Sequence, residues 1–114
     1  YYAFLDNQGF ENKDIEFLKK ARNWYKKIEE KTQDPEVQYF IAMTIPYEEE
    51  KSAVEKFQWL KKSADNGYPY AQLEVGRAFS LGVGTIRDKE QAKKYGKLAC
   101  ESGLARGCYF YNKL

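Results

Sequence analysis

An internal repeat with a period of about 36 residues constrains the fold of this chain more than any other feature. When the sequence is shifted against itself by about that length, Trp59 aligns with Tyr95 and Gly67 aligns with Gly103. Both aligned segments have the pattern of a helix end followed by a glycine that stops it. Such a period is typical of arrays in which each repeat is one helical hairpin.

A third, less regular copy precedes these two. Trp24 aligns with Trp59 at a shift of about 35 residues, and one inserted residue then restores the alignment. Gly67 finds no counterpart in this copy. The turn is instead predicted to contain Asp34, a good N-cap residue, and Pro35 in the first helical position.

Hydrophobic residues recur at helical spacing along the whole chain. Apolar positions at i, i+3, i+4 and i+7 predict helices at residues 12–31, 35–45, 49–66, 69–81, 88–102 and 104–112. We expect Phe17, Trp24 and Val54 to lie on the buried stripes, and Trp24 and Trp59 to fill the space between neighbouring helices.

These patterns predict an all-α fold, an α-solenoid of about three antiparallel helix pairs. A single domain would cover residues 1–114, with repeat units at about 10–45, 46–81 and 82–114.

Individual residues of the repeat also follow a known pattern. In the last unit the matching positions are Gly82-Val83-Gly84-Thr85-Ile86-Arg87-Asp88, Ala92, Tyr95, Ala99, Gly103 and Gly107. A second motif is present as Lys20-Ala21-Arg22-Asn23-Trp24-Tyr25-Lys26-Lys27 and as Trp59-Leu60-Lys61-Lys62-Ser63-Ala64. Over residues 9–114 the chain resembles the Sel-one-like repeat family, a relative of the tetratricopeptide repeat. The link at residues 46–51 departs from the family because it lacks the glycine loop.

The glycine loop of the last unit has a structural explanation. Gly82 and Gly84 can adopt positive φ and turn the chain after the helix at 69–81, and Asp88 can cap the next helix. The loop lacks the Gly-Lys-Ser/Thr ending of a phosphate-binding loop, so we predict a turn rather than a nucleotide site.

The two cysteines, Cys100 and Cys108, fall on either side of the turn at Gly103. The same spacing occurs in a cysteine-rich branch of the resembled family, and this resemblance implies a disulfide between them. Two reduced thiols are the alternative, since Cys100 replaces Ala64 of the preceding unit and small buried positions accept cysteine. Cys108 replaces Gln72, which is not obviously buried. A disulfide would indicate an oxidising compartment such as the periplasm.

Charge and composition argue against several functions. The chain carries 19 basic and 17 acidic residues, a balance that predicts no nucleic-acid partner. No apolar run approaches the ~20 residues that a membrane span needs. Histidine, the commonest general base, does not occur, and two thiols make only half a tetrahedral zinc shell. We therefore predict a non-enzymatic protein without metal or cofactor.

One run of acidic residues leaves an enzymatic function as an alternative. Glu48, Glu49 and Glu50 are interpreted as the solvated first turn of a helix, where the helix dipole favours carboxylates. A carboxylate pair that acts on a cell-wall glycan is the alternative.

The predicted solenoid offers a curved face lined by the first helix of each pair. Polar residues that alternate with the buried stripes are the candidate contacts to another protein, and we expect them to point outward. They are Arg22, Lys26, Glu29, Gln58, Lys61, Lys62, Asp65, Lys94, Lys97 and Glu101. Plain solvation of each side chain is the alternative interpretation.

The function predicted from these features is a non-catalytic protein–protein interaction module of the bacterial envelope. The resemblance suggests an immunity protein that neutralises a toxin delivered by type VI secretion. The alternatives are a cell-wall-active hydrolase of the cysteine-rich branch, or an adaptor or scaffold fragment of a longer repeat protein. The sequence begins at Tyr1 rather than Met, so we expect a removed or trimmed leader. The expected disulfide indicates a periplasmic or secreted location. The oligomeric state is left open.

Overall fold

The computed structural model describes residues 12–46 and 49–114, and these form an all-helical fold in which no strand occurs. Its helices are α2 (Asn12–Thr32), α3 (Pro35–Met43), α4 (Glu50–Asp65), α5 (Pro69–Leu81), α6 (Lys89–Glu101) and α7 (Ala105–Lys113). The fold class predicted from the periodicity is therefore confirmed, with helix ends within about two residues of the expected ones. None of these helices is long and apolar enough to cross a membrane.

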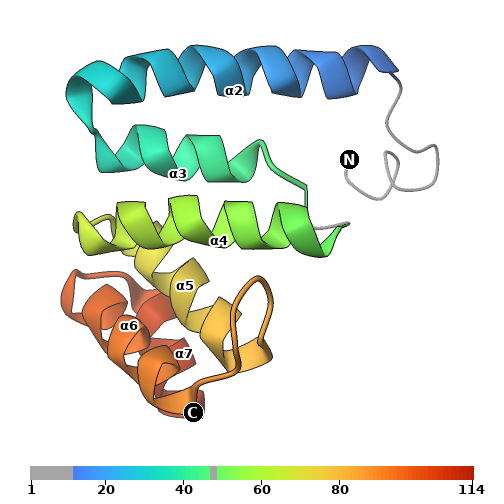
Figure 1. Ribbon diagram of the computed structural model, residues 1–114. Helices are drawn as coiled ribbons and strands as arrows, with labels where there is room; N and C mark the ends of the chain where they lie inside the picture. Colours follow the sequence, from blue (N-terminus) through green and yellow to red (C-terminus); the bar gives the residue numbers. More distant parts are fainter. Residues whose placement is uncertain (1–11, 47–48) are drawn as a thin grey trace.

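Successive helices form hairpins that stack one upon the next (Figure 1). α2 and α3 run antiparallel, and α4 lies beneath α3 in the same orientation as α2. The second half, α5 to α7, is turned relative to this upper layer. Each helix packs mainly against its neighbours in sequence, which is the arrangement of an α-solenoid.

The core lies where α4, α5 and α6 meet. Leu60 and Val75 are fully buried there, and the Phe57 and Phe79 rings meet edge to face with centroids 5.3 Å apart. Phe79 also stacks on Tyr95 of α6, with centroids 6.0 Å apart. Aromatic rings from three helices thus join two repeat units into one core.

The turns between helices follow the predicted chemistry. Asp34 accepts a hydrogen bond from the Glu36 amide at 2.9 Å, and Asp88 accepts one from the Gln91 amide at 3.2 Å. Both are therefore N-caps, as expected. In the first unit the turn contains Asp34 and Pro35 as predicted, and Gln33 there has φ +50°, a positive φ like that of Gly67.

Several residues expected on buried stripes are exposed. Phe17 is 70% exposed and Trp24 62%, and Val54 is also exposed. α2 packs against α3 on one side, and among the described residues no further helix covers its other side. Only part of its apolar stripe is therefore buried. Trp59 is half-buried and packs against the core cluster, so only this tryptophan fills space between helices.

Candidate protein-binding face

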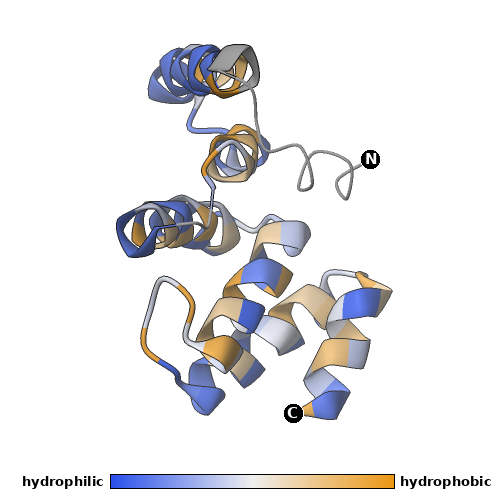
Figure 2. Cartoon of the chain, turned by 90° about the vertical axis from the view of Figure 1, so that its right-hand side faces the viewer, coloured by the Kyte–Doolittle hydropathy of each residue, from blue (hydrophilic) through white to orange (hydrophobic). Residues whose placement is uncertain are grey.

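The first helices of the three pairs bring most of the predicted contact residues onto one side of the molecule. We call this surface, formed by outward residues of α2, α4 and α6, the α2–α4–α6 face. Seen end-on in Figure 2, α2 and α4 are hydrophilic on this side and hydrophobic where they meet α3 and α5. Side-chain contacts connect α2 to α4 and α4 to α6 across the face. It is therefore a continuous surface over three repeat units.

At the junction of α2 with α4, Glu29 is held by Lys62. The Lys62 Nζ donates to both Glu29 carboxylate oxygens, at 3.0 and 3.5 Å. The Glu29 side chain is only 8% exposed, whereas that of Lys62 is 47% exposed. The expectation that Glu29 points outward is wrong, because the neighbouring helix covers it. Its carboxylate anchors Lys62 instead of facing a partner.

Trp59 lies beside this ion pair, between two lysines. The Lys26 Nζ from α2 lies 5.9 Å from the Trp59 ring centroid, and the Lys62 Nζ lies 5.1 Å from it. Lys26 also forms an ion pair with Glu55 at 3.6 Å. Two lysines, each paired with a carboxylate, thus lie beside the half-buried indole ring. Cation–π attraction helps to hold the two lysine side chains in place.

At the junction of α4 with α6, Asp65 connects the helices. The Tyr95 hydroxyl donates to Asp65 at 2.7 Å, and the Lys61 ammonium donates to it at 2.9 Å. Burial raises the pKa of Asp65, but the hydrogen bonds from Tyr95 and Lys61 outweigh it, and the net pKa is lowered. The hydrogen bond to Asp65 raises the pKa of Lys61. Burial, and then the same carboxylate, raise the pKa of Tyr95. Asp65 therefore carries its charge at neutral pH.

Arg22 is the second residue that does not have the expected role. Its guanidinium donates to the Thr44 carbonyl at 2.6 Å and to the Thr44 hydroxyl at 3.1 Å. Thr44 is the C-cap of α3, so Arg22 satisfies the carbonyl end of that helix. Its side chain connects α2 with α3 and is therefore occupied within the protein, not available to a partner on the α2–α4–α6 face.

The remaining candidates are exposed on the surface. Gln58, Lys94, Lys97 and Glu101 are all exposed, and the Lys94 Nζ lies 5.4 Å from the Tyr95 ring centroid. Among the described residues, Lys94 and Lys97 form no ion pair. The α6 part of the face therefore presents two exposed lysines, and Lys94 lies within electrostatic range of Asp65.

The disulfide expected between Cys100 and Cys108 is present and joins α6 to α7, with Cα atoms 4.4 Å apart. The repeat explains its position. Gln72, the equivalent of Cys108, is buried and donates to the Ala64 carbonyl at 3.3 Å, and Ala64 is the equivalent of Cys100. The expectation that Gln72 is not clearly buried is therefore wrong. In the last unit a covalent bond replaces the hydrogen bond between these positions.

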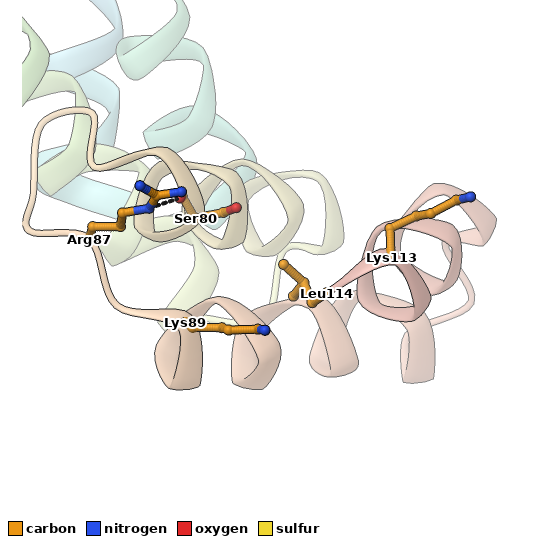
Figure 3. Close-up of a pocket in the computed structure, with 5 residues that line it drawn as sticks. All are labelled: Ser80, Arg87, Lys89, Lys113 and Leu114. Carbon is orange, nitrogen blue, oxygen red and sulfur yellow. Dashed lines mark hydrogen bonds between the residues drawn. The ribbon is translucent and has the colours of Figure 1, made fainter.

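A shallow cavity of about 270 Å³ lies elsewhere, at the far end of the solenoid (Figure 3). It is lined by Ser80, Arg87, Lys89, Lys113 and Leu114. The Arg87 Nε donates to the Ser80 carbonyl at 3.1 Å, and Lys113 points away from the cavity in this view. None of the predicted contact residues lines it, so cavity and candidate face are separate features.

Two residues of the acidic run, Glu49 and Glu50, lie at the start of α4. Glu49 is the N-cap residue of α4 and Glu50 lies in its first turn, and both are exposed. Glu48 lies outside the described residues. Within the described part of the chain, no group of three His, Cys, Asp or Glu side chains is placed to hold a metal ion.

The Glu29–Lys62 pair should contribute measurably to the free energy of unfolding. We expect Lys62→Met to lower it by about 1–2 kcal/mol, because Glu29 would stay buried without its partner, although the exposure of Lys62 limits the effect. A double-mutant cycle with Glu29→Gln, measured by urea unfolding, should give a coupling of about 1 kcal/mol. The exposed Lys61–Asp65 pair is the control, with an expected coupling below about 0.5 kcal/mol. Equal couplings for the two pairs would contradict a special role for the buried carboxylate.

Comparison with known proteins agrees with the repeat and with the fold. The Sel1 repeat matches residues 13–31, 57–68 and 69–104, which together are more than half of the chain. No curated protein matches the chain. Sel1 repeats generally mediate protein–protein interaction, and they are typically non-catalytic modules. Because the match covers more than half of the chain and reaches every hairpin, the chain belongs to the Sel1 repeat family.

Proposed function

We propose that this protein is a non-catalytic interaction module that binds a partner protein through the α2–α4–α6 face. The observation that carries the proposal is the set of contacts that fixes lysines on this face: Lys62 on Glu29, Lys26 on Glu55, and Lys61 on Asp65. Repeat proteins commonly bind through the surface that successive units form together.

Preorganisation supports this choice of face. Binding requires side chains to lose conformational freedom, at a cost of about 0.5–1.5 kcal/mol for each long side chain. Lys26 and Lys62 are already held by carboxylates and by Trp59 in the unbound protein. Tryptophan is also among the residues that most often dominate binding energy. The central part of the face can therefore dock with a small loss of entropy.

Charge supports a partner with an acidic surface. Lys94 and Lys97 extend the face with two exposed positive charges that form no close ion pair among the described residues, while Asp65 lies within electrostatic range of Lys94. Complementary charge increases the association rate and favours one partner over others. We propose that an acidic segment of the partner lies across α6 and α4.

The disulfide supports a location in the bacterial envelope, periplasmic or secreted. Disulfides persist in oxidising compartments and are rare where thiol reductants are abundant. The bridge between Cys100 and Cys108 joins the two helices of the α6–α7 hairpin. A structural rather than a redox role fits this setting.

The family resemblance supports one narrower proposal, that the partner is a toxin delivered by type VI secretion and that this protein neutralises it. A small, preorganised and charged binding face suits tight docking over a toxin's active site. Neighbouring genes that encode a secreted toxin would support this proposal, and a stoichiometric partner of another kind would contradict it while leaving the binding module intact.

The binding face is tested by charge reversal after co-purification of the partner from the native host. We expect the double variant Lys94→Glu, Lys97→Glu to reduce partner affinity by about tenfold or more, because both charges reverse without loss of an internal ion pair. Lys113→Glu, on α7 and away from the face, is the matched control. Calorimetry at two salt concentrations should show that the loss shrinks as salt rises. An unchanged affinity of the double variant would move the interface to another surface.

A further inference from the structure

A second surface of the molecule is built almost entirely of aromatic rings. Six rings from α2, α3 and the start of α5 touch in sequence, and we call them the aromatic patch: Trp24, Tyr25, Phe40, Tyr39, Tyr68 and Tyr70. Successive centroids are 5.1–6.1 Å apart. Every pair of rings is tilted, so the patch is ridged rather than flat. It continues across two repeat units.

Much of this aromatic area is open to solvent. Trp24 is exposed, as noted above, and Phe40 is 38% and Tyr70 46% exposed, while the other three rings are half-buried. Large contiguous apolar patches on a protein surface commonly mark interaction sites. Tyrosine and tryptophan are enriched among the residues that dominate binding energy. The half-buried rings pack against the exposed ones and keep the exposed ring faces in position.

Carboxylates surround the tyrosine end of the patch. Burial raises the pKa of Tyr68, and the charges of Glu36 and Asp34 raise it further. Burial and then Glu74 raise the pKa of Tyr39, and Arg106 opposes this shift. Glu74 is also paired with Arg77 at 3.1 Å. The carboxylates that act on Tyr68 are therefore Asp34 and Glu36 at the start of α3, whereas Glu74 of α5 is offset by nearby cations.

We propose that the aromatic patch is a second docking surface, which accepts a partner segment bearing arginine or lysine side chains. The face of an aromatic ring attracts cations, and a guanidinium group stacks on tyrosine and tryptophan with little loss of hydration. The neighbouring carboxylates add attraction for the same charges and disfavour an anionic membrane or an acidic peptide. The two surfaces of the protein thus select opposite charges: the α2–α4–α6 face an acidic segment, the aromatic patch a basic one.

The test uses two octapeptides as probes, one alternating arginine and serine and one alternating glutamate and serine. The full chain is titrated with each while the ring signals of tyrosine and phenylalanine are followed by NMR. We expect the arginine peptide to shift the signals of Phe40, Tyr68 and Tyr70 in a saturable way and the glutamate peptide to leave them unchanged. Equal shifts with both peptides, or no shift at millimolar arginine peptide, would overturn the proposal.

Matched variants locate the binding. We expect Tyr70→Ser to weaken binding of the arginine peptide about tenfold and Glu36→Gln about threefold, whereas Glu90→Gln, at an exposed acid on α6, changes nothing. Phe40→Ser repeats the ring test at a second exposed position, with folding checked by circular dichroism. An effect of Glu90→Gln as large as that of Glu36→Gln would mean that the peptide binds by general charge attraction and not at the aromatic patch. Ring signals that shift with protein concentration alone would assign the patch to a second copy of this chain.

Discussion

Replacing Gly84 with alanine should lower the free energy of unfolding by about 3–4 kcal/mol, the largest single effect that we expect in this protein. Gly84 has φ +74°, which disfavours any side chain. A Cβ atom there would also collide with the Ala53 carbonyl oxygen and lie 2.9 Å from its carbonyl carbon and 3.0 Å from the Phe57 Cβ. These are atoms of α4, so the substitution should push the glycine loop away from the preceding hairpin.

Gly67→Ala separates the two causes. Gly67 also has positive φ, +97°, but an added Cβ would meet nothing within 4 Å. This variant should lose only the conformational term, about 1–2 kcal/mol. Urea unfolding of both variants measures the difference, which we expect to be about 2 kcal/mol. If both variants lower the free energy of unfolding by the same amount, the close approach of the loop to α4 does not contribute to the effect of Gly84→Ala.

Removing the disulfide should lower the free energy of unfolding by about 2–3 kcal/mol, because the bridge restricts the unfolded chain over a short loop. The bridge closes the α6–α7 hairpin, which has no following repeat among the described residues to pack against. In a Cys100→Ser, Cys108→Ser variant we expect a melting temperature about 10 °C below that of the oxidised protein.

Reductant provides the control for this variant. It should lower the melting temperature of the natural protein to about that of the double-serine variant and leave the variant itself unchanged. Thiol titration under denaturing conditions shows whether reduction was complete. A fully reduced protein that melts at the oxidised temperature would mean that helix packing alone holds α6 against α7.

The helices and their ends were predictable because their signals are local. Asp34 and Asp88 cap helices through contacts within a few residues, and Gly82 marks a helix end by the conformation that it permits. Gln33 was missed for the same reason. A glutamine carries no sequence signal for positive φ, and only the turn between α2 and α3 imposes it.

The candidate face was predictable in part. Spacing of three and four residues places Lys61, Lys62 and Asp65 on one side of α4, as the structure has them. Helical spacing does not tell what lies opposite a side chain, so the burial of Glu29 under Lys62 and the attachment of Arg22 to Thr44 were missed. The aromatic patch was missed because its rings come from segments far apart in the chain. Tyr39 meets Tyr68 only after α3 and α5 have packed.

The sequence by itself determined the repeat, the helical class and the caps, because each depends on spacing along one helix or across one turn, whereas the cysteine pairing was implied by the family resemblance. Only the tertiary structure decided which polar residues became anchors and which apolar residues stayed exposed. Trp24 and Trp59 have the same place in the repeat, yet one is exposed and the other lies half-buried between two lysines. The physical reason is that burial depends on the neighbouring helix, and α2 and α4 have different neighbours.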